Sequence, residues 1–257
     1  MKTQKTICLF SMPRCGSGYF CAIMRNFENI NVNAEIFHSN VCFASSKTVN
    51  ALSSIYNIDN LDLEEKKIKL AHIRFNDSVN FYENFKKTID GECTFFKVFD
   101  HILDETIGNG IKIFQSIIND IDIAFLLKRN TLDAYISENK AQMVGAYATV
   151  DTSHIKIKFD KDEYLFAKER YKGFFKIVET ELKKQNKSLI LLNYEEFITK
   201  SNKNQLNYIS EKTKLKIKDK VYLQYPVQDK TTKYSEKIEN YEEYKKYILT
   251  ESEKYKK

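Results

Sequence analysis

The chain has 257 residues, of which 42% are hydrophobic and 30% charged, so it can bury a substantial core and is not intrinsically disordered. Its seven glycines and two prolines are too few for a turn-rich all-β sandwich. The formal net charge of +6 is compatible with an anionic ligand. The basic residues lie in mixed-sign runs such as EEKKIK rather than in basic clusters interleaved with aromatics, so we expect no nucleic-acid partner.

The five cysteines, Cys8, Cys15, Cys21, Cys42 and Cys93, are odd in number and form no CxxC pair. This pattern indicates free thiols in a reducing compartment. The sequence has neither an N-terminal apolar segment typical of a signal peptide nor an apolar run of membrane-spanning length. We therefore expect a cytoplasmic protein without an integral membrane segment. The oligomeric state stays open, with a homodimer among the options.

The first predicted element is a strand that leads through a turn into a helix. Residues 7–10 form an apolar run typical of a strand buried on both faces. Pro13 ends the strand, because proline has no N–H for the sheet, and Gly16 and Gly18 are expected to let the chain turn. From Tyr19 the spacing of apolar residues predicts a helix that continues to residue 27.

This turn has the composition of an anion-binding loop. The start of a helix directs backbone N–H groups and the positive end of the helix dipole towards one point, which suits a phosphate. Arg14 adds a guanidinium group that can bind phosphate or sulfate oxygens. On the loop alone, an ordinary strand–helix turn with a surface arginine fits equally well.

Further along the chain, apolar runs predict strands that alternate with helices. A short extended piece begins at Ile30, and 41–60 reads as short helices and loop. Three more strands are predicted at 93–102, 121–130 and 188–194. Helices are predicted at 63–89 with a break at Asn76–Asp77, at 107–118, at 131–147 with Thr131 as its N-cap, at 160–186, in a short stretch from Glu195, and at 238–257. The alternation indicates an α/β fold with a mainly parallel sheet.

Polar clusters follow three of these strands, at the edge where ligands bind in parallel sheets. They are the Arg14 loop, Lys97 to His101, and Arg129 with the helix after it. Arg129 at a strand tip and Ser137 on the next helix can reach a single phosphate. Individually, Arg129 also fits a surface arginine, and Ser137 a small helix residue.

Two segments resemble the signatures of sulfotransferases that use 3′-phosphoadenosine 5′-phosphosulfate (PAPS). They are PRCGSGY and FLLKRNTLDAYIS. The segments AEIFH, FFKVFDHI, SENKAQMVGAY, LILLNYEEF and KTTKYSEKIENYEEY follow in the order seen in bacterial carbohydrate sulfotransferases of the trehalose, nodulation-factor and lipopolysaccharide type. The resemblance implies a P-loop-like three-layer α/β fold in a single domain over 1–257. In it, 40–90 would be a helical insertion on the acceptor side and 217–257 a loop and helix covering the cofactor.

The resemblance also implies an activity: transfer of the sulfuryl group of PAPS to a hydroxyl of a carbohydrate or glycolipid. The product nucleotide is 3′-phosphoadenosine 5′-phosphate. Since no predicted strand ends in a clear metal-binding Asp, we expect no metal requirement. In the family the first signature surrounds the 5′-phosphosulfate, and the Arg and Ser of the second hold the 3′-phosphate. The cofactor-binding residues implied here are Arg14, Cys15, Gly16, Ser17, Gly18, Tyr19, Arg129, Ser137, Lys230 and Lys233.

Sulfuryl transfer needs a general base for the acceptor hydroxyl. Glu35 matches the position of the catalytic glutamate in the trehalose-type members, and His101 and His38 are the alternatives. A solvated loop carboxylate is the competing interpretation of Glu35.

The reaction also needs cations. Arg14 is expected to neutralise the charge that develops on the bridging oxygen of the cofactor. Lys97 is either a second cation on the sulfuryl group or an ion-pair partner of Asp100. The loop departs from the family pattern at Cys15, where a serine is usual, and at Gly18, where many members have a threonine.

Two other functions are alternatives to a sulfotransferase. A P-loop kinase-like phosphotransferase would need GxxxxGK[ST], and PRCGSGYF has no lysine at that position. A non-catalytic nucleotide-binding protein would retain the pocket without turnover. Comparing cofactor binding with turnover separates this alternative from an enzyme.

Overall fold

The computed structural model describes residues 5–89, 93–104, 110–145, 147, 150–225 and 229–254. The chain forms two compact units. The first consists of Met1–Lys128 with Phe175–Leu223, and the second of Arg129–Phe174 with Gln224–Lys257. Each unit is described by itself, and a single domain over 1–257 stays a prediction.

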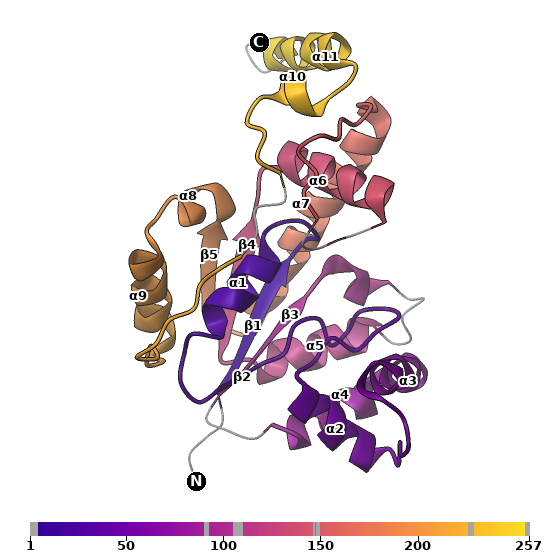
Figure 1. The fold of residues 1–257 in the computed structure, drawn as a ribbon, viewed down its shortest axis with the longest axis vertical. Coiled ribbons are helices and arrows are strands. Elements are labelled where there is room, and N and C mark those ends of the chain that lie inside the picture. The colour runs from indigo at the N-terminus through magenta and orange to yellow at the C-terminus, as the bar shows by residue number, and fades with distance from the viewer. Residues whose placement is uncertain are drawn as a thin grey trace. The chain divides into compact units, whose positions relative to one another are not determined.

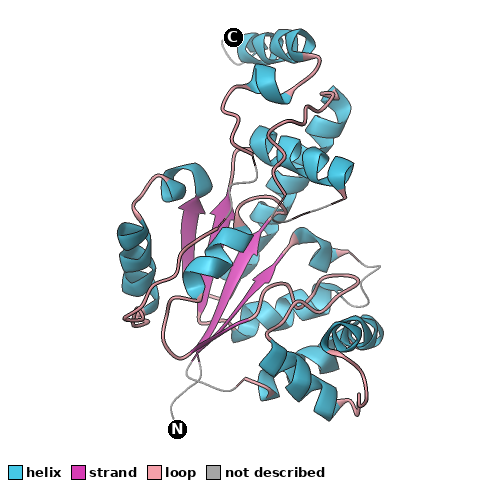
Figure 2. Ribbon diagram, viewed as in Figure 1, coloured by secondary structure: helices cyan, strands magenta, loops and turns pink. Residues whose placement is uncertain are grey.

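The first unit contains a sheet of five strands, all parallel, in the order β2-β3-β1-β4-β5 (Figure 2). This confirms the predicted α/β fold with a parallel sheet. The extended piece predicted at Ile30 is the edge strand next to β3. The strands are β1 (Lys5–Ser11), β2 (Ile30–Val32), β3 (Cys93–Val98), β4 (Ile123–Lys128) and β5 (Leu189–Asn193).

Helices cover both faces of this sheet and give it three layers (Figure 1). Successive side chains of a strand point to opposite faces, so Ile7 and Leu9 of β1 lie on one side, in a core shared with α1 (Ser17–Met24), α8 (Tyr194–Ile198) and α9 (Asn202–Thr213). On the other side Phe10 packs edge-on against Phe114 of α5 (Gly110–Asp120). A strand buried on both faces is therefore apolar throughout, as the sequence predicts.

Three helices follow β2, in the part of the chain that the sequence predicts to be helical. They are α2 (Ser46–Ile55), α3 (Leu63–Asn76) and α4 (Ser78–Lys87). Asp77 explains the predicted break, because it ends α3 and its side chain accepts a hydrogen bond from the N–H of Asn80 as the N-cap of α4. Phe85 of α4 packs against Phe96 of β3, which ties this helical segment to the sheet.

The second unit is built from α6 (Thr131–Val144), part of α7 (Lys161–Lys184), α10 (Tyr234–Lys237) and α11 (Tyr241–Lys254). An aromatic core joins them, with Phe159 and Tyr244 rings 5.2 Å apart. The predicted N-cap Thr131 is wrong: the cap is Asn130, whose side chain accepts from the N–H groups of Leu132 and Asp133. Asparagine competes well for this position because its short amide reaches the free N–H groups of the first turn.

Other boundaries differ from the predictions. The first helix begins at Ser17 and ends at Met24, and β3 ends at Val98, where the short 3-10 helix η1 (Asp100–Leu103) follows. The helix α9 was not predicted, because its apolar residues are few. The first predicted residues of the 107–118 helix lie outside the described residues.

All five cysteines are buried and carry free thiols, as predicted. Within the described ranges, no helix combines the length and the apolar character that crossing a membrane would require.

Candidate active site

The first part of the site is the turn after β1. Gly16 is the N-cap of α1 and has a φ of 86°, in the left-handed region that favours glycine. A Cβ atom on Gly16 would also overlap the ring of Tyr194, which packs directly on the turn. Arg14 has a φ of 63° in the same turn, a conformation that costs free energy in a non-glycine residue. Both positions give the turn its shape.

The first turn of α1 follows at once. N–H groups in the first turn of a helix have no partner within the helix, so Ser17, Gly18 and Tyr19 present the donors that an anion needs. The Ser17 side chain is buried at this point. Gly18 is the second residue of α1, so the prediction that it makes the turn is wrong; of the two glycines, Gly16 has the left-handed backbone and Gly18 does not.

The second part of the site is a cluster of Glu35, Lys97 and His101. Nζ of Lys97 lies 3.5 Å from Oε2 of Glu35, and Nε2 of His101 lies 3.4 Å from Oε1. The Glu35 side chain is 9% exposed, that of Lys97 13% and that of His101 25%. A buried location excludes the interpretation of Glu35 as a solvated loop carboxylate.

Strand register brings the two parts together. Leu9 of β1 pairs with Lys97 of β3, and both strands run in the same direction, so their carboxyl ends meet at one edge. The Nζ atom of Lys97 donates to Oγ of Ser17 at 3.4 Å. Lys97 therefore links the turn at the start of α1 to the carboxylate.

The segment that carries Glu35 is fixed by backbone hydrogen bonds. The N–H of Asn33 donates to the carbonyl of Phe95 and that of Lys97 to Ala34, so the chain continues along β3 beyond β2. The N–H of Phe43 donates to the carbonyl of Glu35 at 3.2 Å. Glu35 thus lies on an ordered turn.

The environment changes the proton affinities of the cluster. Burial raises the pKa of Glu35 above its usual range, although the Lys97 charge acts in the opposite direction. Burial lowers the pKa of His101 to about 4, and it also lowers the pKa of His38. At neutral pH the two imidazoles are uncharged, and the raised pKa makes Glu35 a better proton acceptor than an ordinary glutamate.

His101 has a second contact that bears on its role. Its Nε2 lies 3.2 Å from the backbone carbonyl of Phe37, an atom that can only accept. With the proton on Nε2, the ring donates to this carbonyl and faces Glu35 with the same N–H. Nε2 is then not available to accept a proton, which favours Glu35 over His101 as the base.

The second unit holds the other predicted cofactor-binding residues. Arg129 directly precedes the Asn130 cap of α6, and Ser137 lies within that helix. Lys230 forms an ion pair with Asp151 at 2.7 Å, and the Lys233 side chain is 75% exposed. The cofactor-binding role of all four basic or hydroxyl residues stays a prediction.

Three residues with clear structural roles are not among the site residues that the sequence predicts. Arg74 is fully buried and binds the turn after Glu35, Tyr194 packs on Gly16, and Lys140 is a buried cation paired with Asp229 at 2.8 Å. The sequence offers a signal only for Tyr194, which directly follows an apolar strand. A buried arginine or lysine in a polar helix looks like a surface residue.

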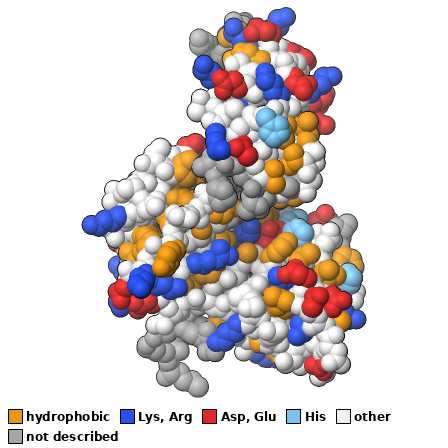
Figure 3. Space-filling model, viewed as in Figure 1, with side chains coloured by type: hydrophobic (Ala, Val, Ile, Leu, Met, Phe, Trp, Pro, Cys, Tyr) orange, Lys and Arg blue, Asp and Glu red, His pale blue; other side chains and the backbone are white. Residues whose placement is uncertain are grey.

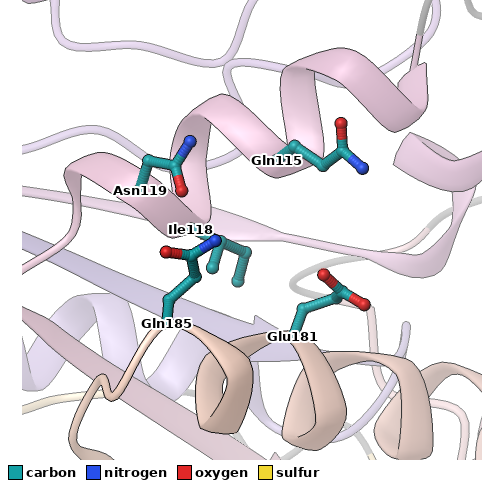
Figure 4. A pocket seen from close by; sticks show the side chains of 5 residues that line it. All are labelled: Gln115, Ile118, Asn119, Glu181 and Gln185. Carbon is teal, nitrogen blue, oxygen red and sulfur yellow. The ribbon is translucent and has the colours of Figure 1, made fainter.

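Elsewhere on the molecule, charges of both signs are interspersed on the described part of the face drawn in Figure 3. A hollow of about 190 Å³ lies between α5 and α7, lined by Gln115, Ile118, Asn119, Glu181 and Gln185 (Figure 4). Its amide and carboxylate side chains include no cation, so it does not suit a phosphosulfate.

Among the described residues, no group of three or more His, Cys, Asp or Glu side chains could hold a metal.

Solved structures show which fold this is. A sulfotransferase domain from the curacin biosynthetic pathway is 13% identical, with a TM-score of 0.52 over 92% of this chain and 83% of that one. A sulfotransferase domain from the Synechococcus PCC 7002 olefin synthase is 11% identical, with a TM-score of 0.48 over 85% and 76%. No family model and no curated protein sequence matches the chain. The first likeness shows that the chain has the fold of a sulfotransferase domain.

Proposed function

We propose that this protein is a sulfotransferase that uses PAPS. The observation that carries the proposal is the position of Lys97, which contacts Ser17 at the start of α1 and faces the buried carboxylate of Glu35. Sulfuryl transfer requires three parts, which are an anion-binding turn, a cation and a base. The fold likeness to a sulfotransferase domain supports the same reaction.

PAPS supplies the sulfuryl group, and its phosphosulfate fits the turn by charge, because the N–H groups at the start of α1 favour an anion. The N–H groups of Ser17 and Gly18 bind its oxygens, together with the Ser17 hydroxyl. Arg14 neutralises the charge that develops on the bridging oxygen. Following the resemblance, we assign the 3′-phosphate to Arg129 and Ser137, with Lys230 and Lys233 as further cations. Cys15 and Tyr19 add contacts to the phosphosulfate.

Glu35 accepts the proton of the acceptor hydroxyl as the acceptor oxygen forms its bond to sulfur. The bond between sulfur and the bridging oxygen breaks, and the electron pair stays on the phosphate of the product nucleotide. Lys97 interacts with the sulfuryl oxygens and with Glu35. His101 acts by holding Glu35 rather than by taking the proton.

The acceptor in this proposal is a carbohydrate or glycolipid hydroxyl, bound on the side of the 40–90 helices. The support is the resemblance of the AEIFH and FFKVFDHI segments to carbohydrate sulfotransferases. A cytoplasmic location and a metal-free reaction remain predictions, and the oligomeric state stays open, with a homodimer among the options.

The experiment is a transfer assay with 35S-labelled PAPS and a panel of glycans and glycolipids. We expect labelled product from the unmodified protein, and Glu35→Gln should lose turnover about 10²–10⁴-fold while binding the product nucleotide normally. Glu64→Gln, an exposed carboxylate on α3, is the control and should retain activity. Nucleotide binding without transfer to any acceptor would favour the non-catalytic alternative, and ATP hydrolysis without sulfate transfer would favour a kinase-like enzyme.

A further inference from the structure

Arg74 is the largest fully buried side chain of the described residues, with none of its surface exposed. It lies on α3, among residues that are mostly exposed and polar. Arginine keeps its charge in proteins, and burying a charge costs free energy unless it is well bonded. A buried guanidinium on a surface helix therefore calls for a specific role.

Its bonds all go to one short turn. Nη1 donates to the carbonyl of Phe37 at 3.2 Å, and Nη2 donates to the carbonyls of His38 and Ser39 at 2.9 and 3.1 Å. Nε is buried and has no hydrogen-bond partner in the described part of the chain. The planar guanidinium thus donates hydrogen bonds to three consecutive carbonyls, which lie 35 to 37 residues away in the sequence.

This turn is continuous with the candidate base. It begins at Glu35, whose carbonyl accepts the N–H of His38. The Phe37 carbonyl bound by Arg74 is also the carbonyl that lies 3.2 Å from Nε2 of His101, and the same Nε2 lies 3.4 Å from Glu35. One carbonyl therefore connects Arg74, His101 and the carboxylate.

We propose that Arg74 is a positioning residue: it fixes the 35–39 turn from α3 and so holds the Glu35 carboxylate against Lys97 and His101. The catalytic part of this proposal rests on the proposed function, while the positional part does not. Lysine cannot replace Arg74 fully, because one ammonium group lacks the planar fork that reaches three carbonyls.

Charge offers a way to separate positioning from simple stabilisation. The groups that act on Glu35 are Lys97 on β3, Asp100 and His101 on η1, and Arg74 on α3, while Arg74 also acts on His38 and Cys42. The Arg74 charge lowers the pKa of Glu35, and burial raises it. Loss of the charge alone therefore raises the pKa of Glu35, whereas release of the turn into solvent lowers it.

The test compares Arg74→Gln, Arg74→Lys and the control Lys69→Gln, which removes an exposed charge from the same helix. We expect kcat of Arg74→Gln to fall about 10²-fold, the loss typical of a small misplacement, with the KM for PAPS unchanged. Arg74→Lys should have a higher kcat than Arg74→Gln. The acid limb of its pH–rate profile should lie at the same pH as that of the unmodified protein. Lys69→Gln should behave as the unmodified protein. If Arg74→Gln folds and its kcat equals that of the unmodified protein, the proposal is overturned.

Two NMR measurements decide the positional part without turnover. The protein has four histidines, so 15N-imidazole spectra resolve His101. We expect the Nε2–H form in the unmodified protein, and a raised pKa of His101 in Arg74→Gln. If that variant does not fold, the guanidinium of the unmodified protein is read directly: separate Nη–H signals support fixed bonds, and one averaged signal overturns the proposal. If no acceptor is sulfated, the proposed function fails, while these spectra still decide whether Arg74 fixes the turn.

Discussion

The ammonium group of Lys97 lies 3.5 Å from the carboxylate of Glu35, and both side chains are largely buried. Lys97 also donates to Ser17 in the first turn of α1. The pair therefore joins the proposed base to the proposed anion site. Removing the Lys97 side chain should therefore affect both the base and the anion site.

We predict that Lys97→Met lowers kcat about 10²–10³-fold, the usual effect of losing one group that stabilises developing charge. Because the Lys97 charge lowers the pKa of Glu35, its removal should also move the acid limb of the pH–rate profile to higher pH. Lys69→Met, an exposed lysine of α3, is the control. An unchanged acid limb would contradict the coupling between Lys97 and Glu35.

The cluster also predicts how stability depends on pH. The pKa of His101 is lowered from 6.5 to about 4, so the unfolded chain binds a proton more readily than the folded protein in this range. Its contribution to stability is present above pH 6.5 and is lost as the pH falls towards 4. Glu35 has the opposite sign: its raised pKa gives a contribution that is complete at low pH and lost as the pH rises through that pKa.

Thermal melts of the unmodified protein, His101→Phe and Glu35→Gln from pH 4 to pH 8 measure both contributions. Relative to His101→Phe, the unmodified protein should lose Tm as the pH falls from about 6.5 towards about 4. Relative to Glu35→Gln, it should lose Tm as the pH rises. Parallel curves would show that neither group is buried as described.

Gly16→Ala should weaken nucleotide binding. Alanine is strained at a φ of 86°, at a cost of about 1–2 kcal/mol, and its Cβ would displace the Tyr194 ring. We expect the displaced turn to direct its N–H groups away from the phosphate and to raise the Kd for the product nucleotide about tenfold or more, which is a loss of about 1.4 kcal/mol of binding free energy. Gly173→Ala is the matched control, because it lies within α7 and its Cβ meets nothing within 4 Å. Equal Kd values for the two variants would contradict a cradle at Gly16.

Lys140 should matter for stability in the second unit. Its side chain is 1% exposed and pairs with Asp229, and it also donates to the Thr152 carbonyl. Lys140→Met removes the charge partner of Asp229 and one hydrogen bond to the Thr152 carbonyl, and should lower the free energy of unfolding by about 1–3 kcal/mol in a urea titration. Lys230→Met, which breaks an exposed pair with Asp151, is the control and should have no measurable effect. Similar losses for both variants would show that burial of Lys140 does not matter.

Most of the fold could be predicted from the sequence because its signals are local. The apolar run in β1 and the polar residues that follow β3 correctly indicated a parallel sheet with a polar edge. Helix ends were less predictable, since Thr131 and Asn130 are both good caps and only the backbone geometry decides between them.

The site was predictable in part, for the same reason. A family resemblance predicts Glu35 and a strand end predicts Lys97, and in the structure Nζ of Lys97 lies 3.5 Å from Oε2 of Glu35. The sequence does not point to Arg74, because its partners are backbone carbonyls, which every residue type has. The prediction for Gly18 is wrong, because Arg14 and Gly16 supply the left-handed residues of the turn and Gly18 lies in α1.

The most direct test of the central claim is a crystal structure with 3′-phosphoadenosine 5′-phosphate bound. The account predicts the 5′-phosphate on the N–H groups of Ser17 and Gly18, with the Glu35 carboxylate and the Lys97 ammonium facing the position of the transferred sulfuryl group. A nucleotide bound elsewhere, or a 5′-phosphate on the Gly16 turn with Glu35 directed away from it, would contradict the account.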